Sequence, residues 1–156
     1  MAENLQEKLE RIAIGYYVGR DGTCAEAMLK AGAETLRIQS PVIPDIAIGL
    51  AGGVGREGSV CGLVTGSALV ISLAVHGIIH DYRAKKSLIL DTTGEFVDAF
   101  LKQAGSYHCR DICGVELKTE GGSRQFTLDT KKERCVPKLK IACKLLAGIL
   151  QSYDTE

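Results

Sequence analysis

Residues 58–80 read GSVCGLVTGSALVISLAVHGIIH and contain no Asp, Glu, Lys or Arg. A stretch of this length and polarity can span a membrane, or it can form a helix that other helices bury on all sides. Gly62, Gly66, Ser67 and Ser72 lie inside it and weaken the membrane interpretation. We therefore expect no membrane span, and instead a soluble helical bundle built around this central apolar helix.

The segments before this stretch show the pattern of amphipathic helices. Apolar residues follow a helical spacing between Leu5 and Tyr16. Thr23 and Glu26 have the spacing of a capping box, so a second helix should begin at Cys24 and break before Pro41. The short apolar segment 46–51 combines glycine with alternating isoleucines, so the sequence does not decide between helix and strand there.

The segments after the apolar stretch also favour helices. A helical stripe covers residues 96–104, a short helix should follow over 109–114, and a last helix should start near Val136 with Pro137 in its first turn. Residues 118–132 are polar and contain paired glycines, which predicts a surface loop. Strand signals are weak throughout. The sequence thus predicts an all-α helical bundle forming a single domain over 1–156.

Composition narrows the function. The chain has 19 Lys and Arg against 19 Asp and Glu, and no Trp, so it offers neither a basic surface nor many aromatic rings for nucleic acid. The first eight residues are polar and lack the apolar core of a secretory signal, from which we expect a cytoplasmic protein. In that compartment six cysteines are more typical of thiols, metal ligands or transient redox partners than of permanent disulfides.

A glycine-rich loop precedes the apolar stretch. Gly53–Gly58 spells G-x-G-x-x-G, and Asp81 follows about twenty residues later, as in dinucleotide-binding sites. No second β-α-β unit follows, however, and Glu57 would face the pyrophosphate. We favour the interpretation that these glycines turn the backbone sharply and pack near Cys61.

Four cysteines fall at predicted helix N-termini: Cys24, Cys61, Cys109 and Cys135. Unpaired backbone N–H groups give such ends a partial positive charge, which favours thiolate over thiol and lowers the thiol pKa. Thiolate is the form that binds metals or attacks disulfides. No local C-x-x-C pair exists, so any shared site must be assembled by the fold.

The two remaining cysteines are compatible with simple packing. Cys143 lies midway along an apolar helix face, where cysteine behaves as a small hydrophobic residue. Cys113 lies one helical turn after Cys109 and could serve either as an alternative ligand or in packing.

The histidines offer weaker candidates. His76 and His80 would share a helix face and could bind a metal, but a solvated helix end is the more common setting. His108 adjoins Cys109 and could orient or deprotonate it, although a surface position is the simpler expectation.

Together, the segments 52–66, 109–114 and 134–137 resemble the C_GCAxxG_C_C family of redox-active proteins, and the likeness spans nearly the whole chain. The four hallmark cysteines of that family match Cys24, Cys61, Cys109 and Cys135. Gly62 and Gly66 match the small residue and the glycine that follow the second cysteine. Cys113 and Cys143 lie outside the family pattern. For related domains fused to haem proteins an iron-sulfur cluster has been proposed.

Our leading hypothesis is a redox protein in which Cys24, Cys61, Cys109 and Cys135 converge to hold a [2Fe-2S] cluster for electron transfer. In this hypothesis the glycine loop, with Gly58 and Gly62, shapes the cofactor surroundings through backbone N–H groups. Two alternatives stay open: a metal-free thiol–disulfide protein, using a pair such as Cys24 and Cys61, and a zinc-stabilised binding module. We expect a redox partner protein but neither nucleic acid nor membrane, and a homo-oligomer is left open.

Overall fold

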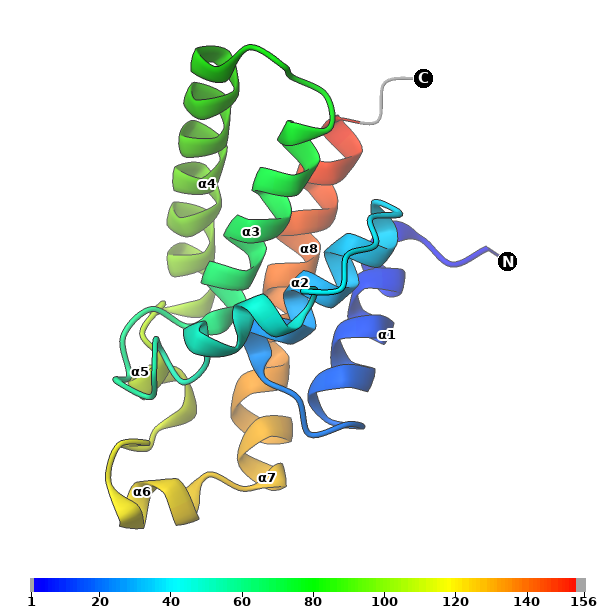
Figure 1. The fold of residues 1–156 in the computed structure, drawn as a ribbon. Coiled ribbons are helices and arrows are strands. Elements are labelled where there is room, and N and C mark those ends of the chain that lie inside the picture. The colour runs from blue at the N-terminus through cyan, green and yellow to red at the C-terminus, as the bar shows by residue number, and fades with distance from the viewer. Residues whose placement is uncertain (1, 154–156) are drawn as a thin grey trace.

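The computed structural model describes residues 2–153, and these residues form an all-α fold without a β-strand (Figure 1). The prediction of the fold class is confirmed. The elements, in chain order, are α1 (Leu5–Tyr17), α2 (Cys24–Thr35), the 3₁₀ helix η1 (Asp45–Leu50), α3 (Gly62–His76), α4 (Tyr82–Ala104), α5 (Cys109–Cys113), α6 (Glu120–Gln125), α7 (Leu128–Thr130), the π-helix η2 (Lys131–Cys135) and α8 (Val136–Ser152).

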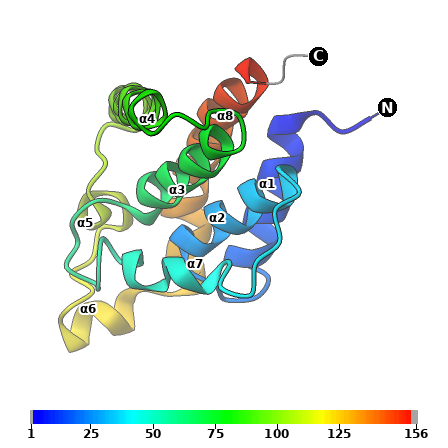
Figure 2. The same ribbon diagram turned by 45° about the horizontal axis from the view of Figure 1, so that its top comes forward.

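Helix α3 forms the middle of the apolar stretch and packs against α2, α4 and α8. It lies between α4 on one side and α2 on the other (Figure 2). No side chain between Cys61 and Val75 is exposed. The helix is shorter than the uncharged stretch 58–80, because Cys61 caps its beginning and Gly77 its end.

Two glycines of α3 allow α2 to approach closely. A Cβ atom on Gly62 would lie 2.5 Å from the Cys24 sulfur and 2.8 Å from the Ala25 nitrogen. A Cβ atom on Gly66 would lie 2.6 Å from the Ala25 carbonyl oxygen. The contact between the two helices therefore depends on the absence of side chains at these positions, and it sets how near Cys24 comes to the start of α3.

The first two helices begin at capping boxes. Asn4 accepts a hydrogen bond from the Glu7 N–H, and Thr23 accepts one from the Glu26 N–H; in both, the glutamate side chain accepts from the backbone N–H of the capping residue. The predicted start of α2 at Cys24 is confirmed. Its end comes at Thr35, earlier than the Pro41 break, and Arg37 then adopts a left-handed backbone conformation with φ of 58°.

The prediction of a surface loop over residues 118–132 was wrong. Thr119 accepts a hydrogen bond from the Gly122 N–H and starts α6, and a capping box between Thr127 and Thr130 starts α7. The backbone then passes through η2 directly into α8, so helical structure runs without interruption from Leu128 to Ser152. These short helices lie at one end of the molecule beside α5 (Figure 1).

The close approach of α2 and α3 gives a first testable expectation. Replacing Gly62 by alanine places a methyl group against the Cys24 sulfur and the α2 backbone, and we expect a loss of about 1–3 kcal/mol in the free energy of unfolding. Gly148→Ala in α8 is the matched control, because its Cβ meets nothing within 4 Å and alanine is the better helix former. Urea unfolding of both variants measures the difference. Equal stability of the two would contradict the packing argument.

Among the described helices, none has the combination of length and hydropathy that a membrane span requires.

Candidate functional site: a cavity lined by cysteines

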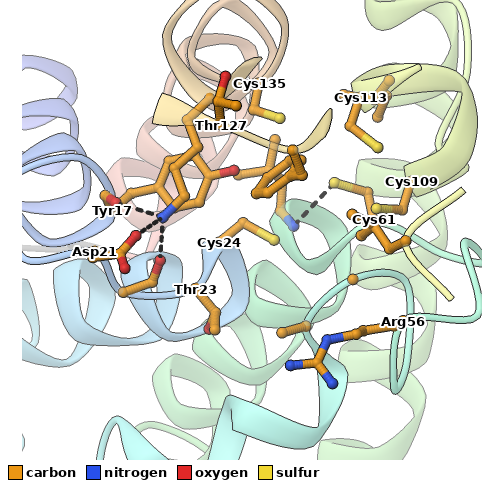
Figure 3. Close-up of a pocket in the computed structure, with 18 of the residues that line it drawn as sticks. Tyr17, Asp21, Thr23, Cys24, Arg56, Cys61, Cys109, Cys113, Thr127 and Cys135 are labelled. Atoms are coloured by element: carbon orange, nitrogen blue, oxygen red, sulfur yellow. Dashed lines mark hydrogen bonds and ion pairs between the residues drawn. The ribbon is translucent and has the colours of Figure 1, made fainter. Parts of the chain in front are cut away.

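Five of the six cysteines line one cavity of about 370 Å³. Their side chains come from four segments of the chain and point toward a common space (Figure 3). These five include all four candidates from the sequence, together with Cys113: Cys24 at the start of α2, Cys61 before α3, Cys109 and Cys113 in α5, and Cys135 at the end of η2. Cys143 is fully buried in α8 and does not line the cavity.

A short backbone bridge brings two of these cysteines together across the chain. The Cys61 N–H donates to the Tyr107 carbonyl, and the Cys109 N–H donates to the Ser59 carbonyl, both at 2.7 Å. Val60 and His108 lie opposite one another in this antiparallel bridge. The segment before α3 and the segment before α5 are thereby fixed side by side, with one cysteine on each.

Cys24 and Cys61 interact as a pair. A hydrogen bond with Cys61, helped by the N–H groups of Ala25 and Gly62, holds the pKa of Cys24 below its ordinary value despite burial. The same contact raises the pKa of Cys61, and burial raises it further. The Leu63 N–H points at the Cys61 sulfur from 3.5 Å. Cys24 is therefore the more acidic thiol of this pair.

Cys109 and Cys113 form a second pair within α5. Hydrogen bonding from Cys109 lowers the pKa of Cys113 to about 6. The pKa of Cys109 is raised, first by this hydrogen bond and then by burial. The Arg134 guanidinium donates to the carbonyls of Ile112 and Asp111 at the end of the helix. Cys113 is therefore the more acidic thiol of this pair.

Cys135 lies apart from both pairs and beside Tyr17. Burial raises the pKa of Cys135 to about 11, and a hydrogen bond from the Tyr17 hydroxyl partly opposes this rise. Burial also raises the pKa of Tyr17, so the phenol keeps its proton and acts as the donor.

Two parts of the helix-terminus argument need correction. Cys135 does not begin a helix, because η2 precedes it and its own backbone is helical. The expected lowering of the thiol pKa holds for Cys24 but not for Cys61, Cys109 or Cys135. Burial disfavours the charged form, and sulfurs in close pairs share a proton, so both effects outweigh the helix ends.

Lys131 joins η2, the element that carries Cys135, to the end of α1 and the residues that follow it. Its ammonium group donates to the Tyr17 carbonyl at 3.1 Å, the Asp21 carboxylate at 2.9 Å and the Gly22 carbonyl at 3.0 Å. It also lies 4.5 Å from the centre of the Tyr17 ring. The lysine side chain is only 8% exposed, whereas that of Asp21 is 93% exposed. These contacts of Lys131, called the Lys131 tether below, therefore combine a buried cation with backbone acceptors and one surface carboxylate.

The glycine-rich loop has a left-handed backbone. Every residue from Gly52 to Arg56 has φ between 60° and 71°, and Gly58 has φ of 75°. A Cβ on Gly53 would lie 2.8 Å from the Cβ of Cys109. The loop is thus a compact turn packed against the cysteines, in an all-α fold and not in a β-α-β unit.

The glycines of this region have different neighbours. Gly52 lines the cavity. Gly58 lies against Arg110, which donates to its carbonyl, and Gly62 lies against Cys24. Gly58 and Gly62 are not among the residues that line the cavity. Their contribution to cofactor binding stays a prediction.

The three histidines lie outside the cavity. His76 and His80 are exposed, and His76 Nδ1 is 2.9 Å from the Lys85 ammonium. His108 is exposed at the start of α5, with its ring edge-on to Tyr107. In the described part of the chain, no three His, Cys, Asp or Glu side chains are grouped closely enough to hold one metal ion. The thiols instead form two close pairs and one separate cysteine around a shared space.

Sequence reasoning assigned no role to Tyr17 or Lys131 and left Cys113 open. The spacing of four between Cys109 and Cys113 was the usable signal, because it places both on one side of a helix. Lys131 lies in a polar segment and carried no signal of burial.

The cysteine arrangement agrees with the comparison to known families. Residues 23–149 match the family described as "Putative redox-active protein (C_GCAxxG_C_C)". No curated protein and no solved structure gives a significant match. The matched range contains all six cysteines and covers most of the chain. The chain therefore belongs to the C_GCAxxG_C_C family.

Proposed function

We propose that this redox protein carries electrons on an iron-sulfur cluster held in the cysteine cavity. The observation that carries the proposal is the meeting of thiols from four distant chain segments at one space. Packing alone does not explain this concentration of cysteines, because a cysteine that only fills space can lie beside any apolar side chain. The cluster would supply one-electron transfer without a change in bonding of the protein.

The donor set fits a [2Fe-2S] cluster. Such a cluster takes four cysteine thiolates, with two on each iron, and therefore needs two pairs of sulfurs on either side of a cavity. Cys24 and Cys61 already form one pair. Cys109 and Cys135, the other two cysteines matched to the family pattern, would hold the second iron, and Cys113 lies within reach of Cys109 as a fifth thiol.

The surrounding groups of this chain can stabilise negative charge on the sulfurs. N–H groups of Ala25 and Gly62 face the Cys24 sulfur, and the Leu63 N–H faces the Cys61 sulfur. The Tyr17 hydroxyl faces Cys135. Hydrogen bonds to cluster sulfurs stabilise the reduced, more negative state and raise the reduction potential.

Metal analysis of protein purified under anaerobic conditions tests the proposal. We expect iron and acid-labile sulfide in equal amounts, with visible absorption that bleaches on reduction. If the preparation is colourless, reconstitution with ferrous iron and sulfide should restore these signals. A protein that takes up no iron after reconstitution, or that binds zinc in its place, would contradict the proposal.

One observation favours a second function, thiol–disulfide exchange by Cys24 and Cys61. Both cysteines line the cavity and shift each other's pKa, and Cys24 is the member whose pKa is lowered. Its thiolate would attack a partner disulfide, and the Cys61 sulfur would then displace the partner, so that two electrons and two protons pass to the partner. Mass spectrometry at controlled redox potential should then join the tryptic peptides 21–30 and 57–83. Failure of this link to form at any potential would exclude the exchange reaction.

The Tyr17 hydrogen bond gives a prediction about the potential. Tyr17→Phe keeps the ring beside Lys131 but removes the donor to Cys135, so the midpoint potential should become more negative. A hydrogen bond worth about 1 kcal/mol corresponds to roughly 40 mV for one electron. Tyr16→Phe is the matched control, because the Tyr16 hydroxyl donates to Glu26 and does not touch the cavity. Spectroelectrochemical titration measures both, and equal potentials would contradict the assignment.

A further inference from the structure

Cys113 takes no part in the proposed cluster, yet it shares a one-turn helix with Cys109. The two residues are four apart in α5, and both line the cavity. In an ideal α-helix, Cα atoms at this spacing are about 6.2 Å apart. Disulfides join cysteines with Cα separations of roughly 4.4–6.8 Å. The pair therefore lies within the range in which a covalent bond can close.

We propose that Cys109 and Cys113 form a second redox site, a dithiol that closes to a disulfide when it meets a small peroxide. The closure itself is independent of the function proposed above. Its consequence for iron rests on that function, because Cys109 would no longer be free as a ligand.

The local structure favours this pair over the others. Helix α5 is short, ends at the left-handed Gly114, and packs against η2. Closing a disulfide between its two cysteines therefore has to adjust only one helical turn. Cys24 begins α2 and Cys61 precedes α3, two longer helices that the close contacts of Gly62 and Gly66 hold together, so closure of that pair has to adjust a larger part of the fold. Cys135 lies on a different element and interacts with Tyr17.

The reaction balances with hydrogen peroxide as the oxidant. One thiolate of the pair attacks a peroxide oxygen and becomes a sulfenic acid, and the peroxide O–O bond breaks to release water. The second sulfur then attacks the sulfenic sulfur, the S–S bond forms, and a second water leaves. The two cysteines lose two hydrogens in total, and the peroxide is reduced to two waters. The cavity gives a molecule of this size access to both sulfurs.

Trypsin makes the test direct, because Arg110 lies between the two cysteines. Cleavage places Cys109 in peptide 103–110 and Cys113 in peptide 111–118, with no other cysteine in either. Reduced, metal-free protein is treated with an equimolar amount of hydrogen peroxide, alkylated and digested. We expect these two peptides joined by a disulfide as the main product. A link from either peptide to that of Cys24, Cys61 or Cys135, or the absence of any link, would overturn the proposal.

Iron uptake tests the consequence separately. After peroxide treatment, wild-type protein should lose most of its capacity for iron in anaerobic reconstitution, and prior reduction with dithiothreitol should restore it. Cys113→Ser protein should keep its capacity after the same treatment, and Cys113→Ala provides the same test if the serine variant does not fold. Loss of iron uptake in both wild type and variant would show that another cysteine is the sensitive one. If no form of the protein binds iron, the cluster proposal is excluded. The peptide result still tests the proposed disulfide between Cys109 and Cys113.

Discussion

Cys61→Ala protein should take up little iron or sulfide in anaerobic reconstitution, whereas Cys143→Ala protein should match the wild type. Both residues are buried cysteines at 4% and 0% exposure, and both substitutions remove the same atom. They differ in position, because Cys61 lines the cavity and is paired with Cys24, while Cys143 lies in the helical core. Iron, sulfide and visible absorption per chain measure the difference.

We expect a large effect at Cys61 because no backbone group can take the place of a missing thiolate as a ligand to the cluster iron. Cys113 is the one additional thiol in the cavity, and it lies one helical turn from Cys109. Substitution at Cys109 should therefore be milder than substitution at Cys61, since Cys113 can take its place. Equal iron content in the Cys61 and Cys143 variants, with both folded by circular dichroism, would remove the basis of the cluster proposal.

Much of the fold could be predicted because its helix ends are encoded locally. The Thr23 and Glu26 capping box and the left-handed Gly105 after α4 each depend on a few adjacent residues. The lack of charged residues in the stretch 58–80 also indicated that it is buried. Its true boundaries needed the structure, because Cys61 caps α3 through contacts that involve the distant Tyr107.

The polar segment 118–132 shows where pattern reasoning fails. Thr119 and Thr127 cap its short helices, but glycines and charged residues hide the helical period. Burial of Lys131 could not be read from the sequence, because its acceptors lie more than a hundred positions earlier in the chain. A residue type that is almost always solvated gives no local signal when tertiary contacts bury it.

Predicted helix N-termini indicate cysteines that line the cavity, but they do not predict the pKa values of these cysteines correctly. Helix ends do lie at Cys24, Cys61 and Cys109, and they direct these side chains toward the cavity. They do not by themselves make all the thiols acidic, since burial and proton sharing decide the pKa of each member of a pair. The helix ends place the cysteines around the cavity, and the interactions within each pair then set which thiol is the more acidic.

Lys131→Met should lower the free energy of unfolding by about 3 kcal/mol, which is a large effect for one substitution. The substitution keeps the aliphatic stem but leaves the carbonyls of Tyr17 and Gly22 without their donor. It also removes the cation beside the Tyr17 ring. Because Asp21 is solvated, the loss of its ion pair should contribute less than the loss of the donor to the buried Tyr17 carbonyl and the partly buried Gly22 carbonyl.

Lys132→Met is the matched control, because its side chain is exposed and the change there should stay within about 0.5 kcal/mol. Urea unfolding of the metal-free proteins gives both values, and iron retention of the reconstituted proteins then reports on the cavity. We expect Lys131→Met to lose iron faster than Lys132→Met, since η2 positions Cys135 through the Lys131 tether. Equal stability and equal iron retention in the two variants would mean that the wall carrying Cys135 is held by its packing against α5 and α8, and not by the buried ammonium group.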